Sequence, residues 1–255
     1  LSTLLPRWAI PPAAVERFVH GTTVATNAVL ERKGAKLGLL TTAGFEDVIE
    51  IGRQNRRQIY ELLLKPETPV FLAPGERRRG VVEAMGPDGA VVTPLDEASL
   101  AEAVDALVAL GVEAIAVSFL FAFVNPAHEQ QAAKFIRARH PKLVVSISSE
   151  VDPAFREYER TLTACMNSFV RPKVEEYVTN LDAELKKGGA TCDVNILRSD
   201  AGLMTTREAG RNPIYGVLSG PSGGVAGAAL FDGGAGTGAS SSKPERSKGF
   251  TMTFL

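Results

Sequence analysis

The fold class is set by residues 96–147, which read DEASLAEAVDALVALGVEAIAVSFLFAFVNPAHEQQAAKFIRARHPKLVVSI. Asp96 is placed to cap a long helix, and the apolar stretch over 114–120 follows it as a buried strand. Asn125 and the proline after it open a second helix, which leads into another strand over 143–147. Because helices and strands alternate at this spacing, the sequence predicts βαβ units and a largely parallel sheet.

The apolar faces of these two helices predict the core against which the sheet packs. Apolar residues recur every three or four positions, as on one face of a helix, and Gly111 ends the first helix. The predicted core positions are Leu100, Ala103, Val104, Leu107, Val108, Ala132, Phe135 and Ile136.

Shorter elements precede this stretch. The sequence predicts a strand over 17–20, a helix over 26–32 that buries Val29 and Leu30, and an apolar strand over 36–41. A continuous apolar strand is typical of a sheet covered on both faces. A short helix follows around 45–51. Residues 52–80 are rich in charge, glutamine and proline and predict an excursion from the sheet, and a hairpin joins 81–84 to 90–92.

The C-terminal part begins with two predicted helices, 155–169 and 172–186, separated because Arg171 precedes a proline. A short strand over 195–197 and a Gly/Ala-rich helix over 221–230 follow. Residues 233–242 read GGAGTGASSS, and the whole tail to residue 255 is predicted to have no fixed fold.

Composition excludes several classes of protein. With 255 residues and 45% hydrophobic content, the chain can form one large domain or two modest ones. A net charge of −1 and a pI near 6.4 argue against nucleic-acid or anionic-membrane binding as the main function. Cys165 and Cys192 lie too far apart for a zinc motif, which favours a reducing cytoplasm, although one disulfide stays open. We expect neither a membrane span nor a signal peptide.

The first candidate binding motif is H-G-T-T-V-A-T-N, residues 20–27. A strand delivers a glycine, three threonines and an asparagine into the start of a helix, where N–H groups and short side chains suit an anionic or carbonyl-bearing ligand. The same residue types also cap helices and satisfy turns, so both interpretations stay open. The candidate residues are His20, Gly21, Thr22, Thr23, Thr26 and Asn27.

Two more candidate motifs are turns. S-G-P-S-G-G, residues 219–224, leads into a helix whose N-terminal N–H groups are free to bind an anion; no G-K-[ST] follows, so it is not a Walker A loop. Ser199 and Asp200, in S-D-A-G, follow a strand at a position where open α/β sheets bind ligands. Tight turns and helix packing are the alternative explanation for both. The candidate residues in S-G-P-S-G-G are Gly220, Ser222, Gly223 and Gly224.

Weaker candidates are charged. Arg53, with Arg56 and Arg57, has the guanidinium geometry for carboxylate or phosphate, but a solvated excursion is the preferred explanation for these residues. The E-Y-E-R segment, residues 157–160, predicts ion pairs on a helix surface. His128 is interpreted as a helix-end residue. We identify no nucleophilic triad and no metal site.

Six stretches carry a combined signal. They are FVHGTTVATNAVLERKGA (18–35), TTAGFEDVIEIGRQ (41–54), NPAHE (125–129), SSEVDPAFREYERT (148–161), RSDAGLM (198–204) and SGPSGGVAGA (219–228). In this order they resemble the hydantoinase A/oxoprolinase family, and acetone carboxylase subunits are its relatives. The resemblance implies an α/β lobe of the RNase H-like, actin-like ATPase kind, with a mixed, mostly parallel sheet and flanking helices.

The resemblance also implies a chemistry. Family members couple ATP hydrolysis to the opening of cyclic amides such as hydantoins or 5-oxoproline, and phosphorylation of the carbonyl oxygen would activate an otherwise poor electrophile. Such an enzyme needs phosphate clamps and Mg²⁺ rather than a protein nucleophile. The implied cofactors of the intact parent are ATP and Mg²⁺, and the implied partners are a cyclic amide and a second, hydantoinase B-type subunit, with no nucleic acid and no membrane.

Two departures from the family pattern bear on activity. A Gly-rich phosphate hairpin is expected before the H-G-T-T element, but residues 1–17 contain no glycine and no aspartate. A D-x-G-G-T-x-x-D element is expected after residue 228, but Asp232 is the last aspartate. Ala201 and Ser222 stand where relatives often have Gly and Ala. We therefore expect an incomplete chain.

The predicted organisation follows from this alignment of motifs. Residues 1–212 would form the N-terminal domain, 213–232 the start of the hydantoinase A catalytic domain, and 233–255 a flexible tail. The prediction is a partial ATP-dependent cyclic-amide hydrolase of the cytoplasm, inactive alone, with Arg53 anchoring substrate and no catalytic residue assigned. A non-catalytic scaffold or regulatory subunit and an acetone-carboxylase-type subunit are the alternatives.

Overall fold

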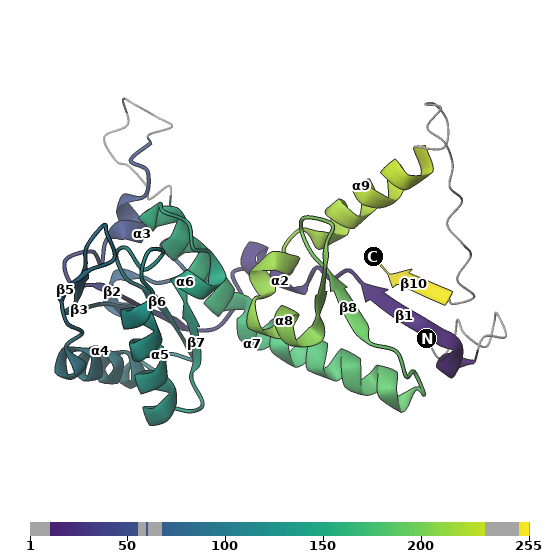
Figure 1. Ribbon diagram of the computed structural model, residues 1–255, viewed down its shortest axis with the longest axis horizontal. Coiled ribbons are helices and arrows are strands. Elements are labelled where there is room, and N and C mark those ends of the chain that lie inside the picture. The colour runs from purple at the N-terminus through teal and green to yellow at the C-terminus, as the bar shows by residue number, and fades with distance from the viewer. Residues whose placement is uncertain (1–10, 56–59, 61–67, 233–249, 255) are drawn as a thin grey trace. The chain divides into compact units, whose positions relative to one another are not determined.

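The computed structural model describes residues 11–55, 60, 68–232 and 250–254, and it divides the chain into two compact units (Figure 1). Unit 1 combines Leu1–Glu31 with Lys173–Leu255, and unit 2 is the continuous stretch Arg32–Pro172. Each unit is built around its own sheet. The division by compactness does not test the domain boundary predicted near residue 212, which stays a prediction.

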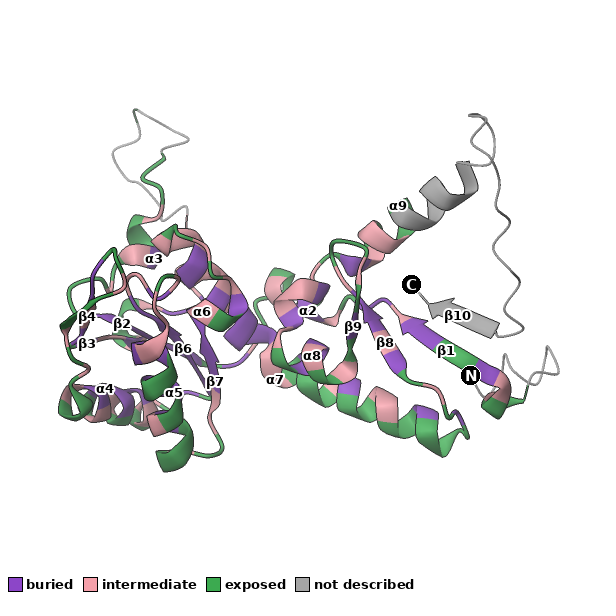
Figure 2. Cartoon of the chain, in the orientation of Figure 1, coloured by how far each residue is buried: buried purple, intermediate pink, exposed green. Residues whose placement is uncertain are grey.

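Unit 2 is a parallel α/β unit, as its alternating pattern predicts. Its four-stranded sheet has the order β3-β2-β6-β7 with every neighbouring pair parallel, and β2 and β6 are buried along their whole length (Figure 2). These strands are apolar throughout because successive residues point to opposite faces of the sheet and both faces are covered. The strands are β2 (Leu37–Thr42), β3 (Arg78–Val81), β6 (Ala114–Ser118) and β7 (Val144–Ile147).

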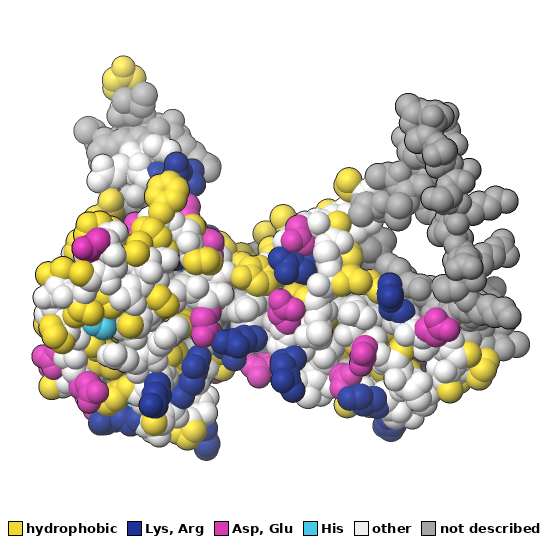
Figure 3. Space-filling model, in the orientation of Figure 1, with side chains coloured by type: hydrophobic (Ala, Val, Ile, Leu, Met, Phe, Trp, Pro, Cys, Tyr) yellow, Lys and Arg dark blue, Asp and Glu magenta, His cyan; other side chains and the backbone are white. Residues whose placement is uncertain are grey.

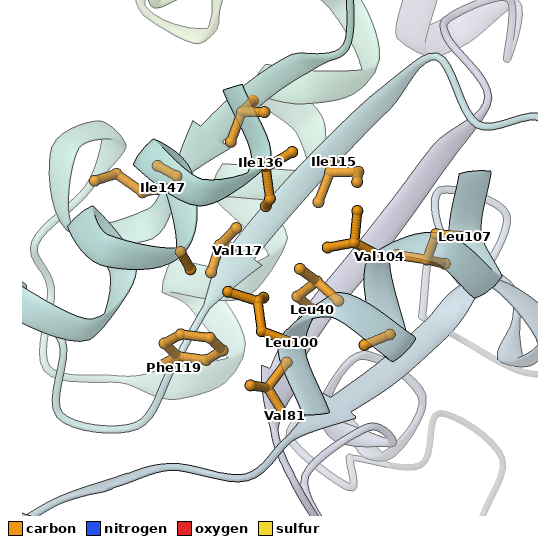
Figure 4. Packing of buried hydrophobic residues seen from close by; sticks show 14 of the residues in the cluster. Leu40, Val81, Leu100, Val104, Leu107, Ile115, Val117, Phe119, Ile136 and Ile147 are labelled. Carbon is orange, nitrogen blue, oxygen red and sulfur yellow. The ribbon is translucent and has the colours of Figure 1, made fainter. Parts of the chain in front are cut away.

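The core of unit 2 lies between this sheet and two helices (Figure 4). The Asp96 carboxylate accepts hydrogen bonds from the first-turn N–H groups of Ala98 and Ser99, as predicted for a cap. Close packing explains Gly38, since an added Cβ would lie 2.9 Å from a methyl of Leu107. Of the predicted core residues, Val108 and Phe135 are only partly buried. The helices are α4 (Glu97–Ala109) and α5 (Ala127–Arg139).

Small elements complete unit 2. A two-stranded hairpin pairs β4 with β5 through a turn in which Gly89 has φ +81°. Val81 belongs to β3, so the predicted hairpin is shorter than expected. The elements are α3 (Val48–Ile51), the 3-10 helix η2 (Gly75–Arg77), β4 (Ala84–Met85), β5 (Val91–Thr93) and α6 (Ser148–Val151).

Unit 1 contains the second sheet, of order β10-β1-β8-β9. Both neighbours of β1 run parallel to it, and β9 is antiparallel to β8. The strands are β1 (Val15–His20), β8 (Val194–Leu197), β9 (Leu203–Thr205) and β10 (Phe250–Phe254). The other elements are η1 (Pro12–Ala14), α2 (Val24–Leu30), α8 (Thr206–Arg211), η3 (Pro213–Gly216) and α9 (Ser219–Asp232).

The helix α7 (Glu157–Lys187) corrects the prediction of two helices, because Pro172 lies inside it. A proline in a helix removes one hydrogen bond and costs about 3 kcal/mol when nothing offsets it. Here Val170 and Val174 are buried on the two sides of the proline, and their packing keeps the helix continuous. The boundary between the two units falls at this proline.

Three other expectations about local structure were wrong. Helix α2 starts two residues early and buries Ala25 and Ala28, which leaves Leu30 75% exposed. Residues 78–80 belong to the edge strand β3 rather than to an excursion, because the buried Arg78 guanidinium bonds Ala73 O, Asp47 and Glu50.

The third concerns the tail. Phe250–Phe254 forms β10, and its alternation of aromatic and β-branched residues suits a strand. Residues 233–249 lie outside the described part of the chain.

The surface of unit 2 is uneven. Figure 3 shows hydrophobic side chains gathered over the end of unit 2 that carries α3 and β5, and basic side chains are more frequent at the opposite end. The exposed hydrophobic residues in the segments that follow β2, β3, β6 and β7 include Phe45, Ile51, Tyr60, Val82, Val91, Val92, Val124 and Phe155. Within the described residues, no helix is long and apolar enough to cross a bilayer.

Candidate functional site

Two predicted motifs lie at one edge of the sheet in unit 1. Strands β1 and β8 are parallel, with His20 beside Ile196, so their carboxyl ends share one edge. The H-G-T-T turn follows β1, and the S-D-A-G turn follows β8. Ligands of open α/β sheets bind at this kind of edge.

The third motif, at the start of α9, is hydrogen-bonded to both turns. The Leu218 N–H donates to Thr26 Oγ1 at 3.0 Å, and Ser219 Oγ donates to the Thr22 carbonyl at 3.2 Å. Ser222 Oγ donates to the Ser199 carbonyl at 2.6 Å. We call this set the turn cluster: Thr22, Thr26, Ser199, Leu218, Ser219 and Ser222.

The histidine of the first motif is engaged by a helix. His20 Nε2 lies 2.6 Å from Tyr177 Oη on α7, and its ring stacks on Phe18. Burial lowers the pKa of His20 below its ordinary value, so the imidazole is neutral at pH 7. A neutral imidazole can still donate one hydrogen bond and accept another.

The remaining residues of H-G-T-T-V-A-T-N divide by exposure. Gly21 and Thr22 are buried, and Thr22 Oγ1 accepts the Val24 N–H at 3.2 Å, which is the turn-capping role expected of threonine. Thr23 and Asn27 are exposed, and the Asn27 amide donates to Thr23 Oγ1 at 3.4 Å. Both side chains are therefore accessible to a ligand.

The S-D-A-G turn is stabilised by its own aspartate. Asp200 Oδ1 accepts the Gly202 N–H at 3.0 Å, and Arg198 lies 3.1 Å from Oδ2. The Gly202 hydrogen bond, followed by the Arg198 charge, lowers the pKa of Asp200, so this exposed carboxylate is ionised at neutral pH. Ala201 has φ +63°, a left-handed conformation that favours glycine.

Two of the glycines that begin α9, Gly220 and Gly224, have no packing reason to be glycine. An added Cβ at Gly220 or Gly224 would meet no atom within 4 Å, whereas each glycine inside a helix costs about 1 kcal/mol relative to alanine. Gly223 is half-buried, and Ser222 is held by the Ser199 carbonyl. Open space at two glycines in the first turns of a helix permits close approach of another molecule.

Arg53 is not part of the turn cluster. It lies in unit 2 and pairs with Glu159 on α7, with Arg53 Nε 2.5 Å from Glu159 Oε1. Its neighbours Gly52 and Gln54 have φ values of +54° and +56°. Arg56 and Arg57 lie outside the described residues.

A buried polar network in unit 2 was missed by sequence reasoning. Glu129 is fully buried and accepts four hydrogen bonds, from the Phe119 and Ser149 N–H groups and the Ser148 and Ser149 hydroxyls. Arg160 is also fully buried and donates to Ser148 Oγ and the Phe119 carbonyl. The prediction that it lies on a helix surface was therefore wrong. The signal that could have found it is the placement of Glu129 and Arg160 within two of the family motifs.

A second buried set surrounds Glu83. His128 Nδ1 lies 2.7 Å from one Glu83 oxygen, and Thr42 Oγ1 donates to the other. The Leu120 N–H donates to Thr42 Oγ1 at 3.0 Å. These bonds connect the ends of β2, β3 and β6 to α5. His128 lies at the start of α5, as predicted, and it is buried there.

The described residues form no group of three or more His, Cys, Asp or Glu side chains that could hold a metal ion. Cys165 and Cys192 are both free, and burial raises the pKa of Cys165 to about 12, so that thiol is unreactive.

Sequence comparisons identify the family. Residues 1–140 match the hydantoinase/oxoprolinase N-terminal region, and residues 160–238 match hydantoinase/oxoprolinase. The chain belongs to the hydantoinase/oxoprolinase family.

Several relatives in this family are named for an enzymatic activity. Caprolactamase subunit alpha of Pseudomonas jessenii is 36% identical over 205 residues, covering 80% of this chain and 29% of that protein. The 5-oxoprolinase 1 of Arabidopsis thaliana is 32% identical over 243 residues, covering 88% of this chain and 19% of that protein. The acetophenone carboxylase gamma subunit of Aromatoleum aromaticum is 34% identical and covers 68% of this chain and 24% of that protein.

Solved structures agree. The ATP-dependent caprolactamase of Pseudomonas jessenii superimposes with a TM-score of 0.77 at 32% identity, over 87% of this chain and 32% of that chain. Nucleotide-free acetone carboxylase gives 0.77 at 24% identity, over 90% and 34%, which shows the fold alone. The predicted fold class, a mostly parallel α/β lobe of the actin-like ATPase kind, is therefore confirmed. The chain spans about a third or less of the length of these relatives.

Proposed function

We propose that this chain forms part of an ATP-dependent enzyme that opens cyclic amides, and that the turn cluster is one wall of its nucleotide and substrate cleft. The observation that carries the proposal is the convergence of three family motifs at the carboxyl ends of β1 and β8. The open space at Gly220 and Gly224 supports it, because a phosphate or carbonyl oxygen can approach backbone N–H groups there.

The chemistry suits such donors. A lactam carbonyl is a poor electrophile, and transfer of a phosphoryl group to its oxygen would make the carbon reactive toward water. Within this chain, α9 would supply backbone N–H donors and the exposed Thr23 and Asn27 would supply side-chain donors to an anionic ligand. Since the described residues contain no group of three or more potential metal-ligating side chains, we assign none of them to Mg²⁺.

The names of two relatives support a partner subunit. Caprolactamase alpha and acetophenone carboxylase gamma are named as subunits, which supports a second, B-type subunit for this chain. Arg53 is proposed as a substrate anchor only if its pairing with Glu159 is exchanged for a ligand carboxylate. We also propose a cytoplasmic location, which the two free cysteines support.

A second candidate function is a carboxylase-type subunit. The match to acetophenone carboxylase gamma covers 68% of this chain. The same fold could therefore serve phosphoryl transfer to a ketone or bicarbonate as well as to a lactam. Turnover distinguishes the two: 5-oxoproline, hydantoin and caprolactam form one panel, and acetone or acetophenone with bicarbonate forms the other. ADP release with the first panel alone supports the lactam proposal, and release with the second alone contradicts it.

The first experiment is titration calorimetry of the chain with ATP and Mg²⁺, using Gly220→Leu as the test variant. The leucine side chain would fill the open space, and we expect at least a tenfold loss of affinity with little change in stability, because the Cβ meets no atom. Gly75→Leu is the matched control, since Gly75 in unit 2 is equally open. Absence of binding by the unmodified chain, or equal binding by Gly220→Leu, would contradict a nucleotide site here.

A further inference from the structure

The start of α9 is attached to unit 1 mainly by hydrogen bonds. Leu218 is 56% exposed and Val225 is 72% exposed, so neither contributes much apolar burial. Gly220 and Gly224 have open space where a side chain would be. The position of the first two turns of α9 therefore depends on the few polar contacts of the turn cluster.

Among these contacts, the one made by Thr26 acts on the backbone itself. Its Oγ1 accepts the Leu218 N–H, across 192 positions of sequence. The other two contacts, Ser219 to the Thr22 carbonyl and Ser222 to the Ser199 carbonyl, use side chains of α9. Thr26 is therefore the side chain outside α9 that holds its connecting peptide.

Leu218 needs such a contact because its backbone is strained. Its φ is +61°, in the left-handed region that costs a non-glycine residue about 1–2 kcal/mol. A single hydrogen bond contributes about 1 kcal/mol, which is comparable with that cost. The hydrogen bond to the Thr26 hydroxyl thus offsets the backbone strain at Leu218, and this residue sets the direction in which α9 follows η3.

We propose that Thr26 is a positioning residue: its hydroxyl fixes the left-handed conformation of Leu218 and so orients the N-terminal N–H groups of α9 toward the ligand of the turn cluster. The ligand part of this inference rests on the proposed function. The positioning part concerns the chain alone and can be measured without ligand. A threonine on the surface of α2 with no such role would be replaceable by any residue of similar shape.

The test uses Thr26→Val, which keeps the shape and removes the acceptor, and Thr26→Ser, which keeps the acceptor. Hydrogen exchange is followed at the Leu218 amide and at the amides of β1 and β8. We expect exchange at Leu218 to accelerate about fivefold to tenfold in Thr26→Val, as loss of one hydrogen bond predicts, and to stay near the wild-type rate in Thr26→Ser. If Thr26→Val does not fold, Thr26→Ala replaces it.

Thr179→Val is the matched control. Thr179 is exposed on α7 in the same unit, and its hydroxyl donates only to the Glu175 carbonyl of its own helix. Unchanged exchange at Leu218 in Thr26→Val would overturn the proposal, and so would uniform acceleration across β1 and β8, since that indicates general destabilisation. Acceleration confined to Leu218 and the first turn of α9 supports it.

Affinity for ATP with Mg²⁺ is the second readout. We expect Thr26→Val to bind about fivefold to tenfold more weakly and Thr26→Ser to restore binding. If the unmodified chain binds no nucleotide, the proposed function fails while the exchange result still decides the role of Thr26. If binding is unchanged although exchange at Leu218 accelerates, the link between this peptide and the ligand is overturned.

Discussion

The two units use polar groups in opposite ways. In unit 2, Glu129 and Arg160 are fully buried and satisfied by several partners each, at the carboxyl ends of β6 and β7. In unit 1, the hydroxyls of Thr26 and Ser222 lie near the surface, and each makes its contact with one backbone group of another segment. Buried networks of the first kind fix a conformation, and contacts of the second kind leave room for adjustment. The comparison teaches that buried, multiply bonded polar groups stabilise unit 2, whereas single hydroxyl contacts connect the segments of the proposed site in unit 1.

The strongest way to break this comparison is Glu129→Ala. The substitution leaves four donors in the interior without an acceptor, including the Phe119 and Ser149 N–H groups, and we expect unit 2 to lose about 3–5 kcal/mol of unfolding free energy. Urea denaturation measures it. Glu102→Ala, at an exposed position of α4, is the control and should change stability by less than about 0.5 kcal/mol. A loss as small as the control's would show that the network is not stabilising.

A core substitution sharpens the difference between the units. Leu100 is fully buried in unit 2, so Leu100→Ala should cost about 3 kcal/mol. Val225 is 72% exposed on α9 in unit 1, so Val225→Ala should change unfolding free energy by less than about 0.5 kcal/mol. Equal losses in the two variants, measured by thermal and urea unfolding, would mean that α9 is covered in solution.

Ser222→Ala tests the turn cluster at a smaller scale. The variant removes the 2.6 Å hydrogen bond to the Ser199 carbonyl, and we expect a cost of about 1 kcal/mol, seen as faster hydrogen exchange around 199–202. Ser168→Ala, a buried serine of unit 2, should leave exchange at these positions unchanged. An identical exchange rate in Ser222→Ala and wild type would remove Ser222 from the cluster.

The smallest expected effect is a pH dependence of unit 2. Burial raises the pKa of Glu129 above its ordinary value, so the folded unit holds this proton more tightly than the unfolded chain does. Its contribution to stability is therefore fully present below about pH 4.5 and is lost as pH rises through the folded pKa. Wild type should lose unfolding free energy relative to Glu129→Gln as the pH rises from 4 to 8, because glutamine does not titrate. A wild type that gains unfolding free energy relative to Glu129→Gln as the pH rises would contradict the raised pKa.

Periodicity predicted most of unit 2, because its strands are covered on both faces and its helices have clear apolar stripes. Asp96 and Gly111 marked the ends of α4 correctly to within two residues. What periodicity could not give was the edge strand β3, where Arg78 is buried with its charge paired, since an arginine in the sequence indicates exposure. Pairing partners of this kind become visible only when the chain is folded.

The sequence located the motifs of the candidate site but not the contacts between them. Motifs after β1 and β8 and at the start of α9 could be located in the sequence, and the structure brings them together in unit 1. The role of any of these residues toward a ligand stays a prediction. The sequence could not show that Leu218 is left-handed, because leucine rarely adopts that conformation. It also could not show that Arg53 pairs with Glu159, and that both lie in unit 2 rather than in the unit that carries the turn cluster.

The division of the chain has a consequence for the order in which its parts fold. Unit 2 is one uninterrupted stretch, so all its strands can pair as soon as Pro172 has left the ribosome. Strand β1 lies before that stretch and β8 after it, so their pairing must close a loop that contains the whole of unit 2. Closing a loop is slow when its ends are far apart in sequence, and a folded insert brings them closer. The proposed nucleotide wall would accordingly be assembled last, on a chain whose middle is already folded.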